Sequence, residues 1–270
     1  MADIIHFHRV SHRYGDGPEI ISDVSFTLGQ GEMAFLTGPS GAGKSTLLRL
    51  TALLARATRG QVLVGGQNLA EIKRRNVPAF RRQIGVIFQN PSLLTERTVF
   101  ENVALPLQLY TRINAVEVRA LVRYKLGLVG LRGYEEFYPS EISGGMRKRA
   151  GLARALALDP EMLFLDEPSA GLDPISSRRL DDLILQLRDG TGASIVVVSH
   201  ELPSLFAIGD DGIFLDGDSK RPIAHGSPKY LLQHSDHPRV QAFLRREPVQ
   251  DEGTHHPVVH HDEDSPGDAS

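Results

Sequence analysis

A glycine-rich segment from Gly38 to Thr46 constrains the fold of this chain more than any other feature of its sequence. It reads Gly38-Pro39-Ser40-Gly41-Ala42-Gly43-Lys44-Ser45-Thr46, which fits the pattern G-x-x-x-x-G-K-[ST]. The apolar run 33–37 precedes this segment and a helix-like run, 47–54, follows it, so the expected order is strand, loop and helix. The glycines let backbone N–H groups turn inward at the start of the helix and form a nest for an anion.

Two side chains of this segment, which we call the P-loop, add to the expected chemistry. Lys44 brings a positive charge for the β- and γ-phosphates, and Ser45 offers its hydroxyl to Mg²⁺. We therefore predict that the chain binds a nucleoside triphosphate. A P-loop alone does not separate kinases, GTPases and motor ATPases, so the reaction has to be read from other residues.

Four short apolar runs predict a parallel β-sheet. They lie at 33–37, 84–88, 161–165 and 194–198 and lack polar alternation, which suits strands covered by helices on both faces. Residues 3–36 instead pair short apolar stretches with turns, and together with 61–64 they predict a small antiparallel sheet. The expected fold class is α/β, a P-loop NTPase fold with a parallel core sheet and an N-terminal antiparallel β subdomain.

The rest of the chain divides by composition. Residues 91–158 are mostly helix-like and lie between two of the predicted parallel strands, so we expect an inserted α-helical subdomain within one domain covering 3–250. The stretch 251–270 holds six acidic residues and four histidines but no Lys or Arg, which predicts a disordered tail.

Capping residues predict where two helices begin and end. Asn114 with Glu117 three positions later is a start signal, and Gly127 is the expected stop. Asp173 precedes a proline and should begin a second helix, which Gly190 is expected to end.

Composition excludes several classes of protein. The formal charge of −3 over 270 residues argues against bulk electrostatic binding of nucleic acid. The absence of cysteine excludes disulfides, thiol catalysis and Cys-ligated metal sites. No apolar run approaches the roughly 20 residues of a membrane span, and residues 1–10 lack a secretory signal, so we expect a soluble cytoplasmic chain unless a partner anchors it.

Two adjacent acids, Asp166 and Glu167, follow the apolar run 161–165. Asp166 stands where a strand tip would help to hold Mg²⁺, and Glu167 can accept a proton from an attacking water. Adjacent acids after a strand are more often a solvated turn, but beside a P-loop the catalytic interpretation is favoured.

Two further features fit phosphate chemistry and also have ordinary structural explanations. Ser143-Gly144-Gly145 opens a helix-like segment, where a serine cap and bare glycine amides form either a second phosphate-binding helix end or a plain N-cap. His200 follows the run 194–198 and can donate to a γ-phosphate oxygen, although a lone histidine is more often structural.

The complete set of motifs is more specific than its parts. The P-loop, Gln89, Ser143-Gly144-Gly145, Asp166-Glu167, Asp173 and His200 follow one another in a single order. This order resembles that of the ATP-binding-cassette (ABC) ATPase family over roughly residues 3–245. The resemblance implies that the nucleotide is ATP, that Gln89 reaches Mg²⁺ and the attacking water, and that His200 is the switch histidine. It also implies that Tyr14 stacks on adenine and that Asp173 closes the D-loop, residues 169–173.

The same resemblance makes Ser143-Gly144-Gly145-Met146 the signature sequence and implies a head-to-tail homodimer. Each ATP would lie between the P-loop of one chain and the signature helix of the other. The family pattern is Leu-Ser-Gly-Gly-Gln, whereas Ile142 and Met146 stand at its two ends here. Both departures spare the serine and the glycines, so phosphate binding is expected to persist.

A single cassette without a membrane span implies a separate integral membrane permease. The segment 91–106 is where the family docks its membrane partner; its apolar residues Leu93, Leu94, Val99 and Phe100 are expected either to line that groove or to pack within the helical subdomain. The stretches 143–149, 152–157 and 237–244 are similar to the ATPases of Mla/Mce-type bacterial lipid transporters. That similarity implies phospholipid cargo, an Mce-domain substrate-binding protein, a small accessory subunit and a peripheral place on the cytoplasmic side of the inner membrane.

Two alternatives remain open. One is an ABC transporter ATPase for another solute, and the other is a non-transport ABC protein acting on ribosomes or DNA. Ribosome-acting members carry two cassettes and DNA-acting ones contain long coiled coils, neither of which this sequence has.

Overall fold

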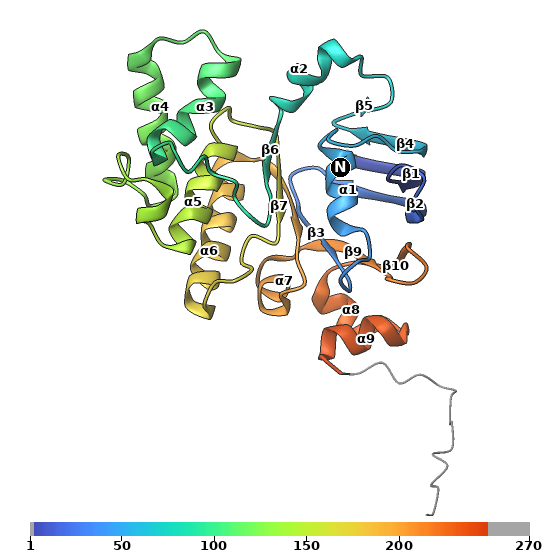
Figure 1. Cartoon of the computed structure of the whole chain (residues 1–270). Helices are drawn as coiled ribbons and strands as arrows, with labels where there is room; N and C mark the ends of the chain where they lie inside the picture. The colour runs from blue at the N-terminus through green and yellow to red at the C-terminus, as the bar shows by residue number, and fades with distance from the viewer. Residues whose placement is uncertain (1–2, 248–270) are drawn as a thin grey trace, which may run out of the picture.

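The computed structural model describes residues 3–247 and contains two β-sheets flanked by helices (Figure 1). The predicted tail, 251–270, lies outside the described residues. The larger sheet has the strand order β10-β9-β3-β8-β7-β6, and the smaller has the order β2-β1-β4-β5. The α/β fold class with a second, antiparallel sheet is confirmed.

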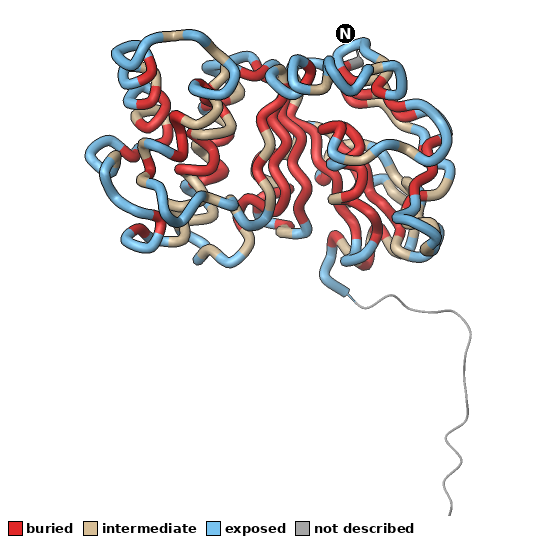
Figure 2. Tube along the Cα trace, turned by 45° about the horizontal axis from the view of Figure 1, so that its top comes forward, coloured by how far each residue is buried: buried red, intermediate tan, exposed pale blue. Residues whose placement is uncertain are grey.

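The larger sheet is parallel except for its edge hairpin. Its strands are β3 (Met33–Thr37), β6 (Ile84–Ile87), β7 (Met162–Asp166), β8 (Ser194–Val198), β9 (Asp211–Leu215) and β10 (Pro222–His225). Every residue of β3, β7 and β8 is buried, and these strands form the interior of the molecule (Figure 2). Coverage on both faces explains why the corresponding runs in the sequence show no polar alternation.

The smaller sheet is antiparallel throughout. It consists of β1 (Asp3–Arg13), β2 (Glu19–Gly29), β4 (Arg59–Val64) and the short β5 (Gln67–Asn68). The turn at 15–18 joins its first two strands, as predicted.

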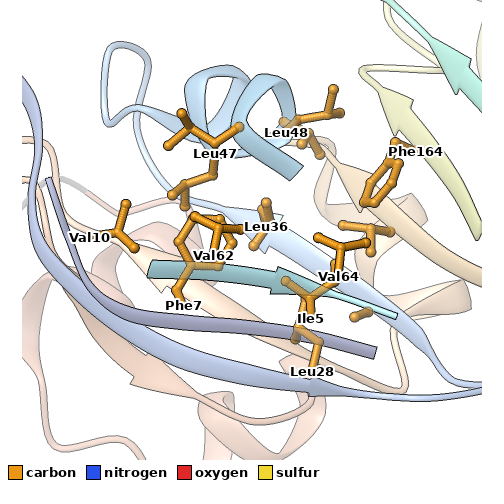
Figure 3. Packing of buried hydrophobic residues seen from close by; sticks show 14 of the residues in the cluster. Ile5, Phe7, Val10, Leu28, Leu36, Leu47, Leu48, Val62, Val64 and Phe164 are labelled. Carbon is orange, nitrogen blue, oxygen red and sulfur yellow. The ribbon is translucent and has the colours of Figure 1, made fainter. Parts of the chain in front are cut away.

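The helix that follows the P-loop, α1 (Lys44–Thr51), packs into a hydrophobic cluster that both sheets share. Leu47 and Leu48 of α1 lie in this cluster with Val62 of the small sheet and with Leu36 and Phe164 of the large one (Figure 3). All five side chains are at most 4% exposed. This packing fixes the helix, and therefore the position of the phosphate-binding loop at its start.

The segment 91–158 contains three helices that pack together to one side of the large sheet (Figure 1). They are α3 (Val99–Tyr110), α4 (Ala115–Leu128) and α5 (Gly144–Ala155). Capping boxes at Thr98 and Asn114 begin the first two, because each side chain accepts an N–H bond while a glutamate three positions later accepts one in return. The start predicted at Asn114 is confirmed.

The remaining helices connect or cover the strands. They are α2 (Val77–Arg81), α6 (Pro174–Thr191), α7 (Leu202–Ile208), α8 (Pro228–His234) and α9 (Pro238–Arg245), with 3₁₀ turns at Arg74–Asn76 and Pro139–Glu141. Asp173 caps α6 as predicted, since its Oδ1 accepts N–H bonds at 3.0 Å from Ile175 and Ser176. None of the helices within 3–247 has the length and apolar character that a membrane crossing requires.

The predicted stops of two helices were wrong. Helix α4 passes Gly127 and ends at Leu128, and Gly130 beyond it adopts φ +68°. Helix α6 passes Gly190 and ends at Thr191, where Gly192 forms the left-handed cap with φ +68°. In both cases the chain reverses at the next glycine along, because only the residue outside the last helical turn needs a positive φ.

This assignment predicts opposite effects for two neighbouring substitutions. Gly190 is helical and exposed, and an added Cβ meets no atom within 4 Å, so Gly190→Ala should raise the free energy of unfolding by about 0.5–1 kcal/mol. Gly192→Ala should lower it by about 1 kcal/mol, because alanine is strained at a positive φ. Urea denaturation followed by circular dichroism measures both values, and equal effects of the two substitutions would contradict the assigned helix end.

Candidate functional site

A cavity of about 750 Å³ opens above the P-loop. The P-loop lines it with every residue of Gly38–Thr46 except Ala42, which is 1% exposed and packs into the core instead. Gln89, Glu167 and His200 lie at the same cavity, so the structure brings side chains from three other parts of the chain to the P-loop.

The P-loop owes its shape to glycines with left-handed backbone angles. Gly38 has φ +133°, Gly41 +78° and Gly43 +93°. At Gly38 a Cβ atom would stand 2.1 Å from the carbonyl oxygen of Leu215, and at Gly43 it would stand 2.9 Å from that of Ile20. These positions therefore need glycine both for the backbone angle and for the close approach of a neighbouring strand.

Lys44 lies within the loop rather than in solvent. Its Nζ donates to the carbonyl oxygens of Gly38 at 2.8 Å and Pro39 at 2.9 Å, and the residue is 8% exposed. Burial lowers the pKa of Lys44, while the nearby charges of Glu167 and Asp166 act in the opposite direction. The ammonium group thus lies at the cavity with the carboxylates of Glu167 and Asp166 as nearby countercharges, an arrangement that a phosphate oxygen would improve.

Ser45 and Asp166 form a pair of hard oxygen donors. Ser45 Oγ donates to Asp166 Oδ1 at 3.1 Å, although these residues belong to α1 and β7. Burial raises the pKa of Asp166; the bond from Ser45 opposes this rise and the neighbouring charge of Glu167 adds to it. A buried carboxylate with an adjacent carboxylate and a hydroxyl fits a divalent cation such as Mg²⁺, which prefers oxygen ligands and would offset the repulsion.

Glu167 and His200 form the most tightly held pair of the site. Glu167 Oε1 lies 2.6 Å from His200 Nδ1, and Glu167 Oε2 is buried without a hydrogen-bond partner among residues 3–247. The backbone of Glu167 adopts φ +49°, in the left-handed region that non-glycine residues rarely occupy. Its N–H donates to the carbonyl oxygen of Val198 at 2.8 Å. A strained backbone at a carboxylate that lines a cavity is typical of a functional position.

The structure does not bring every predicted residue to this cavity. Tyr14, predicted to stack on adenine, is absent from its lining and is 43% exposed. Its ring instead meets that of His12 edge-on, with centroids 4.7 Å apart.

The signature residues lie at a different hollow of the same chain. Ser143 and Gly145 line a groove of about 450 Å³ between the helical subdomain and α6, and the P-loop does not reach it. Ser143 Oγ accepts the N–H of Met146 at 3.2 Å, so it caps α5 as predicted. Gly144 opens the same helix, and Asp173 caps the next one. Within one chain, therefore, the signature and the P-loop line two separate hollows.

Several side chains at or beside the site were not predicted from the sequence, among them Glu19, which also lines the cavity. Lys220 and Phe243 line the P-loop cavity from the C-terminal part of the chain. Lys148, on α5, donates to the carbonyl oxygens of Ala170 at 2.6 Å and Glu167 at 3.3 Å, so it links α5 to the turn that follows β7. The two lysines belong to no local sequence motif, so only the tertiary structure shows that they lie at the site.

The segment 91–106 was predicted either to line a docking groove for a permease or to pack within the helical subdomain, and most of its named apolar residues are at least partly buried. Val99 is 0% exposed and packs in the helical cluster, and Leu93 and Phe100 pack partly against that cluster. Leu94 alone among the four named residues is open to solvent, at 43% exposure. Packing within the helical subdomain, the second of the two interpretations, therefore describes Val99 and in part Leu93 and Phe100.

Comparison with known proteins places this geometry in context. Residues 21–170 match a family model described as ABC transporter. The chain is 39% identical over 244 residues to the intermembrane phospholipid transport system ATP-binding protein MlaF of Escherichia coli strain K12, covering 90% of this chain and 89% of that protein. It is 41% identical over 238 residues to the methionine import ATP-binding protein MetN 1 of Rhodococcus jostii, covering 86% and 70% respectively. Among solved structures, the chain superposes on the ATP-binding cassette MJ0796, in its dimeric post-hydrolysis state bound to ADP and Pi, with a TM-score of 0.75. The two chains are 27% identical, and the match covers 83% of this chain and 98% of that one.

Proposed function

The chain belongs to the ATP-binding subunits of ABC transporters and is an ATPase, and we propose that its ATP hydrolysis drives phospholipid movement between bacterial membranes. The observation that carries the choice of cargo is the similarity to MlaF over nearly the full length of both chains. The chain is similar to a methionine import ATP-binding protein to the same degree, which supports the transport role equally. A polar solute is therefore the alternative cargo.

The proposed catalytic sequence follows from the contacts at the cavity. The P-loop amides and Lys44 bind the phosphates and hold the γ-phosphate near the end of β7. Glu167 lines the cavity and accepts the proton of the attacking water with its carboxylate, which His200 holds through Oε1. His200 keeps the carboxylate oriented through its Nδ1 and donates to a γ-phosphate oxygen in this scheme.

Ser45 and Asp166 are the residues that would hold Mg²⁺, with Gln89 at the same cavity as a third oxygen donor. The cation, when bound, neutralises charge that develops on the β- and γ-phosphate oxygens. Gln89 is exposed at the rim, so it can contact both this site and the attacking water.

We infer further that two copies associate head to tail. In support, Ser143, Gly144 and Gly145 present a capped helix N-terminus at a groove that the P-loop of the same chain does not reach. A second copy would bring this end to the γ-phosphate, in line with the dimeric state named for the MJ0796 cassette. Asp173 and the D-loop lie beside the signature groove, where Leu172 is part of its lining.

The membrane partners of this proposal are an integral permease, an Mce-domain substrate-binding protein and a small accessory subunit. The chain would then lie peripherally on the cytoplasmic side of the inner membrane. Leu94 is the apolar residue of the segment 91–106 that is free to contact a permease.

Affinity purification of the full-length chain from the membranes of the cells that encode it tests the cargo. We expect mass spectrometry to find a permease and an Mce-domain protein, and the reconstituted complex to move a fluorescent phospholipid between vesicles only with hydrolysable ATP. The same complex carrying Glu167→Gln is the control and should be inactive. Co-purification with a periplasmic amino-acid-binding protein, or transport of methionine in place of lipid, would select the alternative.

A further inference from the structure

Part of the lining of the nucleotide cavity comes from residues that belong to none of the predicted site motifs. The hairpin loop 216–221, between β9 and β10, and the helix α9 contribute Lys220 and Phe243 to its lining. Both elements come after the last residue of the predicted catalytic set, His200.

The hairpin loop is packed directly against the P-loop. Lys220 Nζ donates to the carbonyl oxygen of Gly41 at 3.2 Å. A Cβ added at Gly217 would stand 3.1 Å from Pro39 Cγ, so the two loops touch at a second point. Contact at two points keeps the ammonium group of Lys220 at the phosphate-binding loop.

The backbone of Lys220 is also fixed. It adopts φ +59°, and its carbonyl oxygen accepts the N–H of Ser22 on β2 at 3.3 Å. A non-glycine residue in this conformation is costly unless its surroundings impose it, and such positions gather at ligand sites.

Ion pairs hold the loop to α9. Arg239 donates to Asp216 Oδ1 at 2.6 Å and lies 2.7 Å from Asp218 Oδ2, while the Ser219 N–H bonds Asp216 Oδ2 at 2.8 Å. Burial alone would raise the pKa of Asp216, but the Ser219 and Arg239 bonds outweigh it and lower the pKa to about 2. The loop therefore stays clamped throughout the physiological pH range.

No carboxylate within the described part of the chain neutralises the charge of Lys220. Its ammonium has three donors, of which the Gly41 carbonyl takes one, and it forms no ion pair with a carboxylate of residues 3–247. Glu19, a carboxylate of the same cavity, is instead engaged by Arg13 and Arg59. Two donors and one positive charge remain free for an anion beside the P-loop.

We propose that the loop 216–221 is a second phosphate-binding element, in which Lys220 contacts the phosphate chain of bound ATP and Arg239 positions it through Asp216. This rests on the proposed ATP site and extends it to the C-terminal part of the chain. Lys220 is a binding residue in this scheme, and Arg239 is a positioning residue.

Calorimetric titration of the full-length chain with Mg²⁺ and a non-hydrolysable ATP analogue tests the proposal. Lys220→Met should weaken binding about tenfold, the typical loss for a hydrogen bond to a charged group, and Lys220→Arg should recover most of it. Adenosine, which lacks phosphate, should bind both variants as it binds the unmodified chain. Lys229→Met, at an exposed lysine of α8, is the matched control and should bind normally.

A double-variant cycle tests the role of Arg239. Arg239→Gln alone should weaken analogue binding severalfold, and adding it to Lys220→Met should cause little further loss, because Arg239 acts through Lys220. Normal binding by Lys220→Met, an equal loss for adenosine, or additive losses in the double variant would each overturn the assignment. If the unmodified chain bound no ATP analogue at all, the proposed ATP site itself would fail instead.

Discussion

Replacing Glu167 by glutamine is expected to leave ATP binding intact and to slow ATP turnover at least about a hundredfold, the contribution of a positioned general base. Glutamine has nearly the same shape and keeps a carbonyl oxygen for the contact with His200 Nδ1, which is 2.6 Å from the native carboxylate. It cannot take up the proton of the attacking water. The effect should therefore fall on turnover and not on the affinity for ATP.

The measurement combines steady-state phosphate release with titration of a fluorescent ATP analogue. Glu161→Gln is the matched control, because Glu161 is an exposed glutamate that directly precedes β7, whereas Glu167 directly follows it, and Glu161 lies outside the cavity. It should change neither quantity. Near-normal hydrolysis by Glu167→Gln would remove Glu167 from the role of base, whereas loss of ATP binding would show that the carboxylate mainly supports the P-loop.

The phosphate-binding half of the site could be predicted from the sequence because its determinants are local. Glycines at 38, 41 and 43 allow the positive φ angles of the loop, and Lys44 and Ser45 follow directly. The shape of the loop is therefore determined by residues that are neighbours in the sequence. Asp166 could be placed for a related reason, since the carboxyl ends of parallel strands meet at one edge of a sheet.

The rest of the cavity could not be predicted, since it depends on which strands become neighbours. Strand β9 pairs with β3 and thereby brings the loop 216–221 to the P-loop, although the two are far apart in the sequence. A short apolar run such as 211–215 predicts a strand at most and does not identify the strand beside it. Lys220 and Phe243 are therefore visible only in the folded chain.

Tyr14 is the opposite case, a residue that the sequence assigned to the site but that does not line the cavity in the structure. Its distance from the P-loop in the sequence matched the place of an adenine-stacking aromatic in the resembled family, yet its ring lies against His12 and does not line the cavity. Sequence spacing fixes the position of a residue along β1 and its following turn, but the rotamer depends on the side chains around it. The role in stacking stays a prediction.

Gly38→Ala is expected to reduce ATP turnover about a hundredfold or more, because a displacement of about 1 Å in a positioning element has an effect of this size. The added Cβ would stand 2.1 Å from the carbonyl oxygen of Leu215, and the backbone at Gly38 has φ +133°. Either the P-loop or β9 must shift, and both line or support the cavity. We also expect the free energy of unfolding to fall by about 1–3 kcal/mol.

Gly31→Ala separates the collision from the backbone strain. Gly31 also has a left-handed backbone, with φ +76°, but it lies outside the cavity and an added Cβ meets nothing within 4 Å. This variant should lose about 1 kcal/mol of stability and keep normal turnover. Thermal unfolding and phosphate release measured on both variants give the comparison. If Gly38→Ala kept its activity while losing stability as Gly31→Ala does, the close contact between the P-loop and β9 would have no part in shaping the nucleotide site.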